Sequence, residues 1–197
     1  AEGAEKLSAR IRQELSEMGF LDIRFELPLT PLREPTANGM DEAHFVVSLN
    51  PGEPMRPLSE VASGGELSRI MLSIKTVLAD RDEIPTLIFD EIDTGISGRT
   101  AEKVSEKLRK IARLHQVLLI THLPQIAAKA DQHFCIEKSV SGGHTHTKIH
   151  ALSEDESVLE LARLLAGDHI TDAVRANARE LKYAWKSPSG KNADGDH

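Results

Sequence analysis

The sequence predicts an α/β fold in which a mostly parallel sheet is flanked by helices and preceded by an antiparallel strand pair. The middle of the chain alternates between amphipathic helices and short apolar strands, in the order 64–79, 86–89, 98–114 and 117–120. This alternation is typical of parallel strands joined by helices that cover the sheet. Polar residues follow directly after each apolar strand, so we expect the chemistry at the carboxyl edge of the sheet.

The antiparallel pair is predicted before residue 50, because two segments there alternate apolar and polar residues with the period of a half-buried strand. These segments cover residues 23–29 and 43–49. The stretch 28–40 between them holds three prolines and an Asn-Gly pair. That composition predicts a loop or a long hairpin.

A helix is predicted over residues 4–18, and Gly19 is expected to end it. Its apolar residues fall on one face: Leu7, Ile11, Leu15 and Met18. An apolar face of this kind is typical of a helix packed on a core. A second interpretation, the returning end of a coiled coil, stays open because so short a segment cannot establish a heptad series.

After the second apolar strand, the sequence predicts a short helix, two strands joined by a Ser-Gly-Gly turn, and two closing helices. Proline starts the short helix, and Ser153 is expected to cap the first closing helix. These elements span residues 124–130, 133–137, 145–152, 155–166 and 170–185. We therefore expect one lobe over residues 20–185, a helical stub at 1–19, and a disordered tail at 186–197, which is rich in Ser, Gly and Asp.

The composition of the chain bears on whether it binds nucleic acid or a membrane and on the cell compartment in which it works. With 197 residues, of which 40% are hydrophobic and 28% charged, the chain is long enough for one domain with a real core. A net charge of −7 and an aromatic content of 4% argue against a nucleic-acid surface in this segment. The single cysteine, Cys135, cannot form an internal disulfide. No run approaches the roughly 20 apolar residues of a membrane span, so we expect a cytoplasmic protein.

The strongest chemical signal precedes the helix at 64–79 and consists of Ser63, Gly64, Gly65 and Glu66. Adjacent glycines let the backbone approach a ligand closely. The helix start offers free N–H groups and a partial positive charge, which together suit a phosphate. Taken alone, these four residues favour a plainer interpretation, a serine-capped helix after a flexible loop.

Polar residues at the ends of the two apolar strands supply the second signal. The strand at 86–89 ends in Asp90 and Glu91, and the strand at 117–120 is followed by His122. In nucleotide hydrolysis one carboxylate holds Mg²⁺ and a second orients the attacking water. A neutral imidazole at the same edge can donate to a γ-phosphate oxygen. Each feature alone is common at strand ends, but their order after a glycine-pair helix favours phosphate chemistry.

In this order the three elements resemble the signature motif, the Walker B motif and the switch histidine of ABC-type ATPases. The resemblance implies a three-layer ATPase head half. It also implies that residues 63–66 contact nucleotide in trans, that Asp90 binds Mg²⁺, and that Glu91 and His122 are catalytic. Residues 93–98 occupy the place of the D-loop, which crosses the dimer interface in that superfamily. The D-loop residues expected at the interface are Asp93, Thr94, Gly95 and Ser97.

Within this superfamily the sequence resembles the RecN family of SMC-like ATPases, which act in bacterial double-strand-break repair and recombination. Transporter cassettes usually follow the catalytic glutamate with Pro-Thr-Ser, whereas this chain continues Ile-Asp-Thr-Gly-Ile-Ser-Gly at 92–98. Agreement extends over roughly residues 20–185, and the stretches that carry it are 62–69, 121–127 and 161–167. One departure is that Ile96 and Ser97 stand where SMC D-loops typically end in Leu-Asp.

No Gly-x-x-x-x-Gly-Lys-Ser/Thr sequence occurs in the chain. In SMC-like proteins this P-loop lies in an N-terminal lobe, beyond a long coiled coil. The resemblance therefore implies that the chain is a C-terminal lobe that works with the N-terminal lobe, with ATP and Mg²⁺, and with a second head in a homodimer. DNA would be bound mainly through other parts of the full-length protein, near the nucleoid and without a membrane. The isolated chain is expected to be inactive.

Two rival functions stay open. A transporter cassette shares the ATPase core, but it would carry its own P-loop and dock a membrane subunit. A structural clasp would use ATP mainly to tether DNA ends with little turnover, although Glu91 and His122 argue for hydrolysis.

Several other residues have competing interpretations. Three histidines alternate on one predicted strand: His144, His146 and His150. They could bind a metal, but Lys148 shares their face, which favours a solvated hairpin. Arg69, one turn into the glycine-pair helix, could contact nucleotide or the P-loop lobe, or form a structural ion pair. Cys135 is expected to be a buried strand residue without a redox role.

Overall fold

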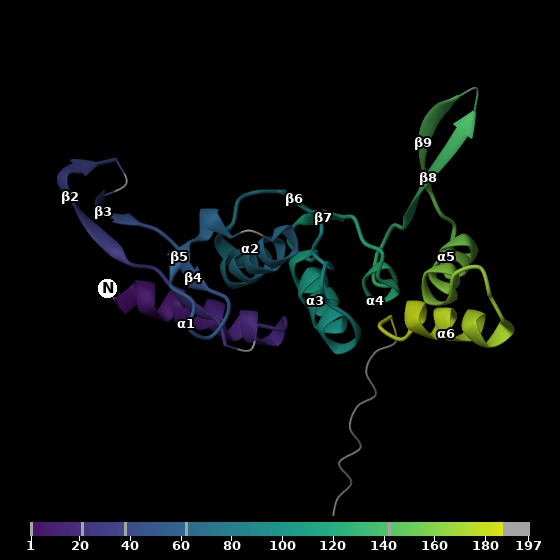
Figure 1. The fold of residues 1–197 in the computed structure, drawn as a ribbon, viewed down its shortest axis with the longest axis horizontal. Coiled ribbons are helices and arrows are strands. Elements are labelled where there is room, and N and C mark those ends of the chain that lie inside the picture. Colours follow the sequence, from purple (N-terminus) through teal and green to yellow (C-terminus); the bar gives the residue numbers. More distant parts are fainter. Residues whose placement is uncertain (1, 21, 38, 62, 142, 187–197) are drawn as a thin grey trace, which may run out of the picture. The chain divides into compact units, whose positions relative to one another are not determined.

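The computed structural model describes residues 2–20, 22–37, 39–61, 63–141 and 143–186. The chain divides into two compact units, Ala1–Thr121 and His122–His197, which are described separately (Figure 1). Apart from Lys186, the tail predicted to be disordered lies outside the described residues, as does Ala62 of the stretch 62–69. None of the helices in the described part of the chain combines the length and the apolar character that crossing a bilayer requires.

The first unit contains the glycine-pair helix and both apolar strands. Its helices are α1 (Glu2–Glu17), η1 (Leu58–Glu60), α2 (Gly64–Leu78), η2 (Ala79–Arg81) and α3 (Gly98–Ile111). Its strands are β1 (Arg24–Glu26), β2 (Leu29–Thr36), β3 (Gly39–Ala43), β4 (Val46–Ser48), β5 (Arg56–Pro57), β6 (Thr86–Phe89) and β7 (Gln116–Leu119). The predicted boundaries of α2 and β6 are confirmed to within one residue.

Strands β6 and β7 form a parallel pair in which Phe89 lies opposite Leu119. Antiparallel pairing joins β1, β4 and β5 into one sheet and β2 and β3 into a hairpin. The α/β class is confirmed, and within the described residues the parallel part consists of this one strand pair. The hairpin alternative for the proline-containing connection is also confirmed.

The single strand predicted over residues 23–29 is wrong, since β1 ends at Glu26 and β2 begins at Leu29. Pro28 lies in the gap between them, and proline has no N–H to donate to a strand ladder. The strand predicted over 43–49 divides in the same way into the end of β3 and the short strand β4.

Helix α1 packs against α2 through the apolar face that the sequence predicts. Ile11 and Leu15 are fully buried in a cluster with Phe25, Ile70 and Ile74. Burial of such side chains contributes roughly 1.5–3 kcal/mol each. The first helix is therefore part of the core that holds α2, whereas its continuation as a coiled coil stays a prediction.

The second unit is a hairpin followed by two packed helices. Its elements are α4 (Pro124–Ala127), β8 (Phe134–Ser141), β9 (His144–Ala151), α5 (Glu154–Ala166) and α6 (Asp172–Tyr183). Ser153 caps α5 as predicted: its Oγ accepts the N–H of Glu156, whose carboxylate in turn accepts the N–H of Ser153. The core is formed by small and branched side chains: Ala127, Ala128, Val158, Leu161, Ala162 and Ala178.

Candidate functional site

The glycine-pair segment forms a capped helix start. Ser63 has extended backbone angles, and its Oγ accepts a long hydrogen bond of 3.4 Å from the N–H of Glu66. Helix α2 then begins at Gly64. The serine thus serves as a cap. Its hydroxyl hydrogen can still be donated to another acceptor, so the cap and an anion site are compatible.

The two acids lie at the carboxyl end of β6, as predicted. Leu87 and Phe89 of the strand are buried, whereas Asp90 and Glu91 are exposed. One oxygen of Asp90, Oδ1, accepts the backbone N–H of Glu91 at 2.9 Å. This bond fixes the Asp90 side chain and leaves Oδ2 available for a water or a cation.

Glu91 has a positive φ of 56°, which no other non-glycine residue in the described part of the chain shows. This conformation costs about 1–2 kcal/mol for a residue with a Cβ atom. It begins a tight turn in which the N–H of Thr94 donates to the carbonyl of Glu91 at 3.0 Å. Strain of this kind is common at functional sites, where the surrounding structure holds it in place.

The glycine pair packs directly against this turn. A Cβ on Gly64 would lie 2.2 Å from Oε2 of Glu91, and a Cβ on Gly65 would lie 2.9 Å from both the Glu91 carbonyl oxygen and the Thr94 Cβ. The missing Cβ atoms therefore allow the start of α2 to meet the turn after β6. The Glu91 carboxylate lies at the positive end of the helix dipole, which is favourable. The structure thus brings the predicted signature residues and the predicted catalytic carboxylate together.

The D-loop segment is anchored at its buried end and exposed beyond it. Asp93 is 3% exposed, and its Oδ2 accepts a hydrogen bond of 2.5 Å from the Thr121 hydroxyl. Thr94 and Gly95 are exposed. Ser97 takes the N-cap position of α3, but its side chain makes no capping hydrogen bond. The N–H of Thr100, which a cap would bind, instead donates to the Ser97 carbonyl at 3.2 Å.

The end of β7 lies beside the end of β6. Because the strands are parallel and Phe89 pairs with Leu119, both carboxyl ends reach the same edge, where the N–H of Ile120 donates to the Phe89 carbonyl at 3.2 Å. Thr121 closes the first unit and His122 begins the second. The placement of His122 against the two acids therefore stays a prediction.

Arg69 is a site residue whose partners the sequence did not reveal. Its guanidinium donates to the carbonyls of Thr94 at 2.8 Å and Ile92 at 3.4 Å, and it lies 5.3 Å from the ring centre of Phe20. Burial lowers the pKa of Arg69, although the charge of Glu66 opposes this shift. Of the two alternatives for Arg69, the structural one takes the form of hydrogen bonds to backbone carbonyls instead of an ion pair, and contact with nucleotide or the P-loop lobe stays a prediction. The sequence signal that could have revealed this role is a positively charged residue on the core-facing side of an amphipathic helix, because such a charge needs buried hydrogen-bond partners.

The other candidates belong to the second unit. Among the described residues, no three His, Cys, Asp or Glu side chains are placed to hold a metal ion, so the hairpin histidines form no such site. Cys135 is partly buried, and burial raises the pKa of its thiol. This shift favours the thiol over the reactive thiolate.

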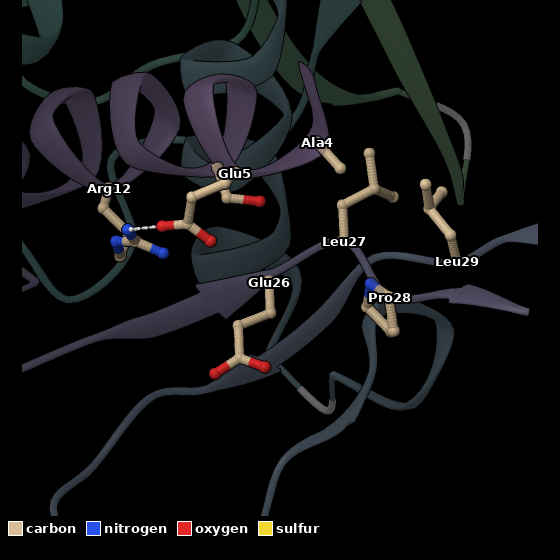
Figure 2. A pocket seen from close by; sticks show the side chains of 8 residues that line it. Ala4, Glu5, Arg12, Glu26, Leu27, Pro28 and Leu29 are labelled. Atoms are coloured by element: carbon tan, nitrogen blue, oxygen red, sulfur yellow. Dashed lines mark hydrogen bonds and ion pairs between the residues drawn. The ribbon is translucent and has the colours of Figure 1, made fainter. Parts of the chain in front are cut away.

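A pocket of about 440 Å³ lies between α1 and the segment from β1 to β2 (Figure 2). Arg12 and Glu5 form an ion pair of 3.0 Å on its wall. The lining residues are Ala4, Glu5, Ser8, Arg12, Glu26, Leu27, Pro28 and Leu29. None of them is a predicted site residue, so this pocket is separate from the acids and the glycine pair.

Comparison with protein-family models gives no match. Comparison with curated proteins does: the chain is 43% identical over 185 residues to DNA repair protein RecN of Halalkalibacterium halodurans. It is 42% identical over 193 residues to RecN of Bacillus subtilis and 45% identical over 187 residues to RecN of Treponema pallidum. The three alignments cover 90%, 90% and 92% of this chain. This chain is related to the C-terminal part of RecN proteins.

The alignments span only 32%, 34% and 33% of these RecN relatives, so the chain corresponds to about a third of their length. Solved structures agree on the fold. The Smc head domain with a coiled coil and joint from Pyrococcus yayanosii matches 80% of this chain and 28% of that chain, with a TM-score of 0.55 and 20% identity. The Smc head domain from Pyrococcus furiosus, bound to the C-terminal domain of ScpA, matches 81% and 38%, with a TM-score of 0.51 and 20% identity. The fold is that of half an SMC-type head.

Proposed function

We propose that this chain is the C-terminal half of an SMC-like ATPase head that acts in DNA double-strand-break repair and recombination. The observation that carries the proposal is the contact between the glycine pair at the start of α2 and the turn formed by Glu91. This contact joins an anion-suited helix start to Glu91, the second of two acids at a strand end, in a chain related to RecN. In the full-length protein the result is a P-loop-class ATPase.

Each residue has a role that follows from its chemistry. Asp90 holds Mg²⁺, directly or through water, with the carboxylate oxygen that the Glu91 N–H leaves open. Bound Mg²⁺ neutralises charge on the phosphates of ATP. Glu91 accepts a hydrogen bond from the attacking water and orients it, and His122 donates to a γ-phosphate oxygen.

The chain works with parts that it lacks. The N-terminal lobe supplies the Walker A loop that grips the β- and γ-phosphates, so the isolated chain is inactive. In a homodimer of heads, Ser63, Gly64 and Gly65 of one head cover ATP held by the other, and the exposed Thr94 and Gly95 lie at the interface. DNA is bound through other parts of the full-length protein, which works at the nucleoid.

The test is Glu91→Gln in the full-length protein, with Glu83→Gln, an exposed acid before β6, as the matched control. Loss of the water-orienting carboxylate should lower ATP turnover about 100-fold or more. The ATP-bound dimer should persist longer, as measured by size-exclusion chromatography with ATP, while the control behaves as wild type. Unchanged turnover would remove Glu91 from this role. An unmodified protein that binds ATP yet never turns it over, even with DNA, would indicate the clasp instead.

A further inference from the structure

Two consecutive side chains of α2 bind the turn that follows β6. The Ser68 hydroxyl donates to the carbonyl of Asp90 at 2.7 Å. The Arg69 guanidinium donates to the carbonyls of Thr94 at 2.8 Å and Ile92 at 3.4 Å. The helix therefore binds three alternate carbonyls of this five-residue turn, the segment that contains both predicted acids and the start of the D-loop.

Arg69 is an unusual side chain for its position. It is 7% exposed, beneath the ring of Phe20, and its Nε has no hydrogen-bond partner among the described residues. Burying a guanidinium that hydrogen-bonds to neutral carbonyls is costly compared with burying an apolar side chain of similar volume. An apolar residue would satisfy the packing of α2 but could not bind the turn. The guanidinium's contribution is thus orientation of the turn rather than core packing.

The same turn is tied on its other side to the end of β7. Asp93, 3% exposed, accepts the hydroxyl of Thr121 at 2.5 Å. Thr121 immediately precedes His122 in the sequence. The turn thus lies between the glycine-pair helix, whose Arg69 binds its carbonyls, and the strand end that leads to the predicted switch histidine, whose Thr121 binds its Asp93 carboxylate.

We infer that Arg69 is a positioning residue that locks the turn 90–94 to α2, so that the glycine-pair helix start and the predicted catalytic carboxylate move as one body. This inference rests on the proposed ATPase function. A phosphate that displaces the start of α2 then also displaces Glu91 and Thr94. Both bonds come from one guanidinium nitrogen, Nη1, whose two N–H groups are fixed in the guanidinium plane, whereas the N–H groups of a lysine ammonium rotate freely on a flexible chain.

The experiment compares Arg69→Lys with Arg12→Lys in the full-length protein. Arg12 is the matched control, because it too donates to a backbone carbonyl, that of Phe25 at 2.8 Å, but it lies away from the turn. For Arg69→Lys we expect kcat to fall about 10-fold or more while KM for ATP changes less than about threefold, since a misplaced carboxylate weakens the transition state rather than binding. Hydrogen exchange of the amides at 91–94 should quicken, and Arg12→Lys should change neither quantity.

Ser68→Ala gives a second test that does not depend on a buried charge, since alanine suits a helix. It should lower kcat several-fold without lowering the melting temperature, and it decides the matter if Arg69→Lys fails to fold. The inference would be wrong if Ser68→Ala kept the wild-type kcat. It would also be wrong if kcat fell no more in Arg69→Lys than in Arg12→Lys. If Glu91→Gln also retains turnover, the proposed function fails; if only the Arg69 and Ser68 variants retain it, this inference alone fails.

Discussion

At the scale of single residues, the two adjacent glycines differ in what surrounds them. The Cβ position of Gly64 faces the end of the flexible Glu91 side chain, whereas that of Gly65 faces the backbone of Glu91 and the Cβ of Thr94. A flexible side chain can move aside, but a turn held by hydrogen bonds cannot. Gly65 is therefore required by the packing of α2 on the turn, whereas Gly64 is required by the position of the Glu91 carboxylate.

We predict that Gly65→Ala lowers the free energy of unfolding of the first unit by about 1–3 kcal/mol, the usual cost of overpacking. Gly64→Ala should cost less, because the gain in helix propensity offsets the movement of Glu91. The measurement is hydrogen exchange of the α2 amides in the two variants. Equal protection in both would contradict the packing that we describe.

Sequence patterns predicted the elements that carry the candidate site residues, but not the contacts between those residues. Asp90 and Glu91 could be placed at a strand end, because a short apolar run that is followed directly by two acids is typical of a buried strand that ends at the protein surface. The positive φ of Glu91 and the carbonyl partners of Arg69 depend on a turn whose geometry is set by packing across residues far apart in sequence. No local pattern encodes such contacts.

At the scale of elements, burial determined what could be predicted. The helices α1, α2 and α3 carry apolar faces that predict their existence, whereas α1 begins two residues before its predicted start and α3 ends three residues before its predicted end. The hairpin of β2 and β3 is exposed along nearly all of its length, so it has no burial pattern to read. Strand β8 runs to Ser141, beyond the predicted end at 137, because pairing with β9 rather than burial extends it.

A polar cluster joins α5 and α6 to His133, the residue that precedes β8. The Oγ of Ser157 is 2.8 Å from both Nδ1 of His133 and Nζ of Lys182, which is 3% exposed and also lies 3.6 Å from Glu154. Burial lowers the pKa of His133, and the charge of Lys182 adds to this shift while Glu160 opposes it. The folded unit therefore favours the neutral imidazole.

Because the folded pKa of His133 is below its unfolded value, its stabilising contribution is present above the ordinary histidine pKa of about 6.5. That contribution is lost as the pH falls through the folded pKa. We predict that the denaturant midpoint, followed by fluorescence of Trp185 in this unit, falls between about pH 7 and pH 5. His133→Gln should flatten this dependence. A midpoint in the wild type that stays constant over this range would contradict the assignment.

At the scale of the whole molecule, one face of the β6–β7 pair exposes apolar side chains. Ile88 is 73% exposed, and Leu118 and Ile120, which share its face by the two-residue period of strands, are 47% and 57% exposed. Since the chain spans about a third of its RecN relatives, we expect the N-terminal lobe to cover this face.

We predict that Ile88→Lys leaves the stability of the chain nearly unchanged but abolishes its association with a separately produced N-terminal lobe. A buried lysine without a partner would cost several kcal/mol at such an interface. The control is Leu159→Lys, which replaces a 45% exposed leucine on α5. Association would be measured by calorimetry, and binding of the Ile88→Lys chain at wild-type strength would exclude this face.

The central claim is that one head supplies the helix start while the other supplies the catalytic carboxylate for the same ATP. The most direct measurement is ATP turnover by a mixture of two full-length variants, Ser63→Arg and Glu91→Gln, exchanged into mixed dimers before ATP is added. Each variant alone should be inactive, and the mixture should recover about a quarter of the wild-type rate, because half of the dimers are mixed and each has one intact site. A mixture no more active than its two components would contradict the claim.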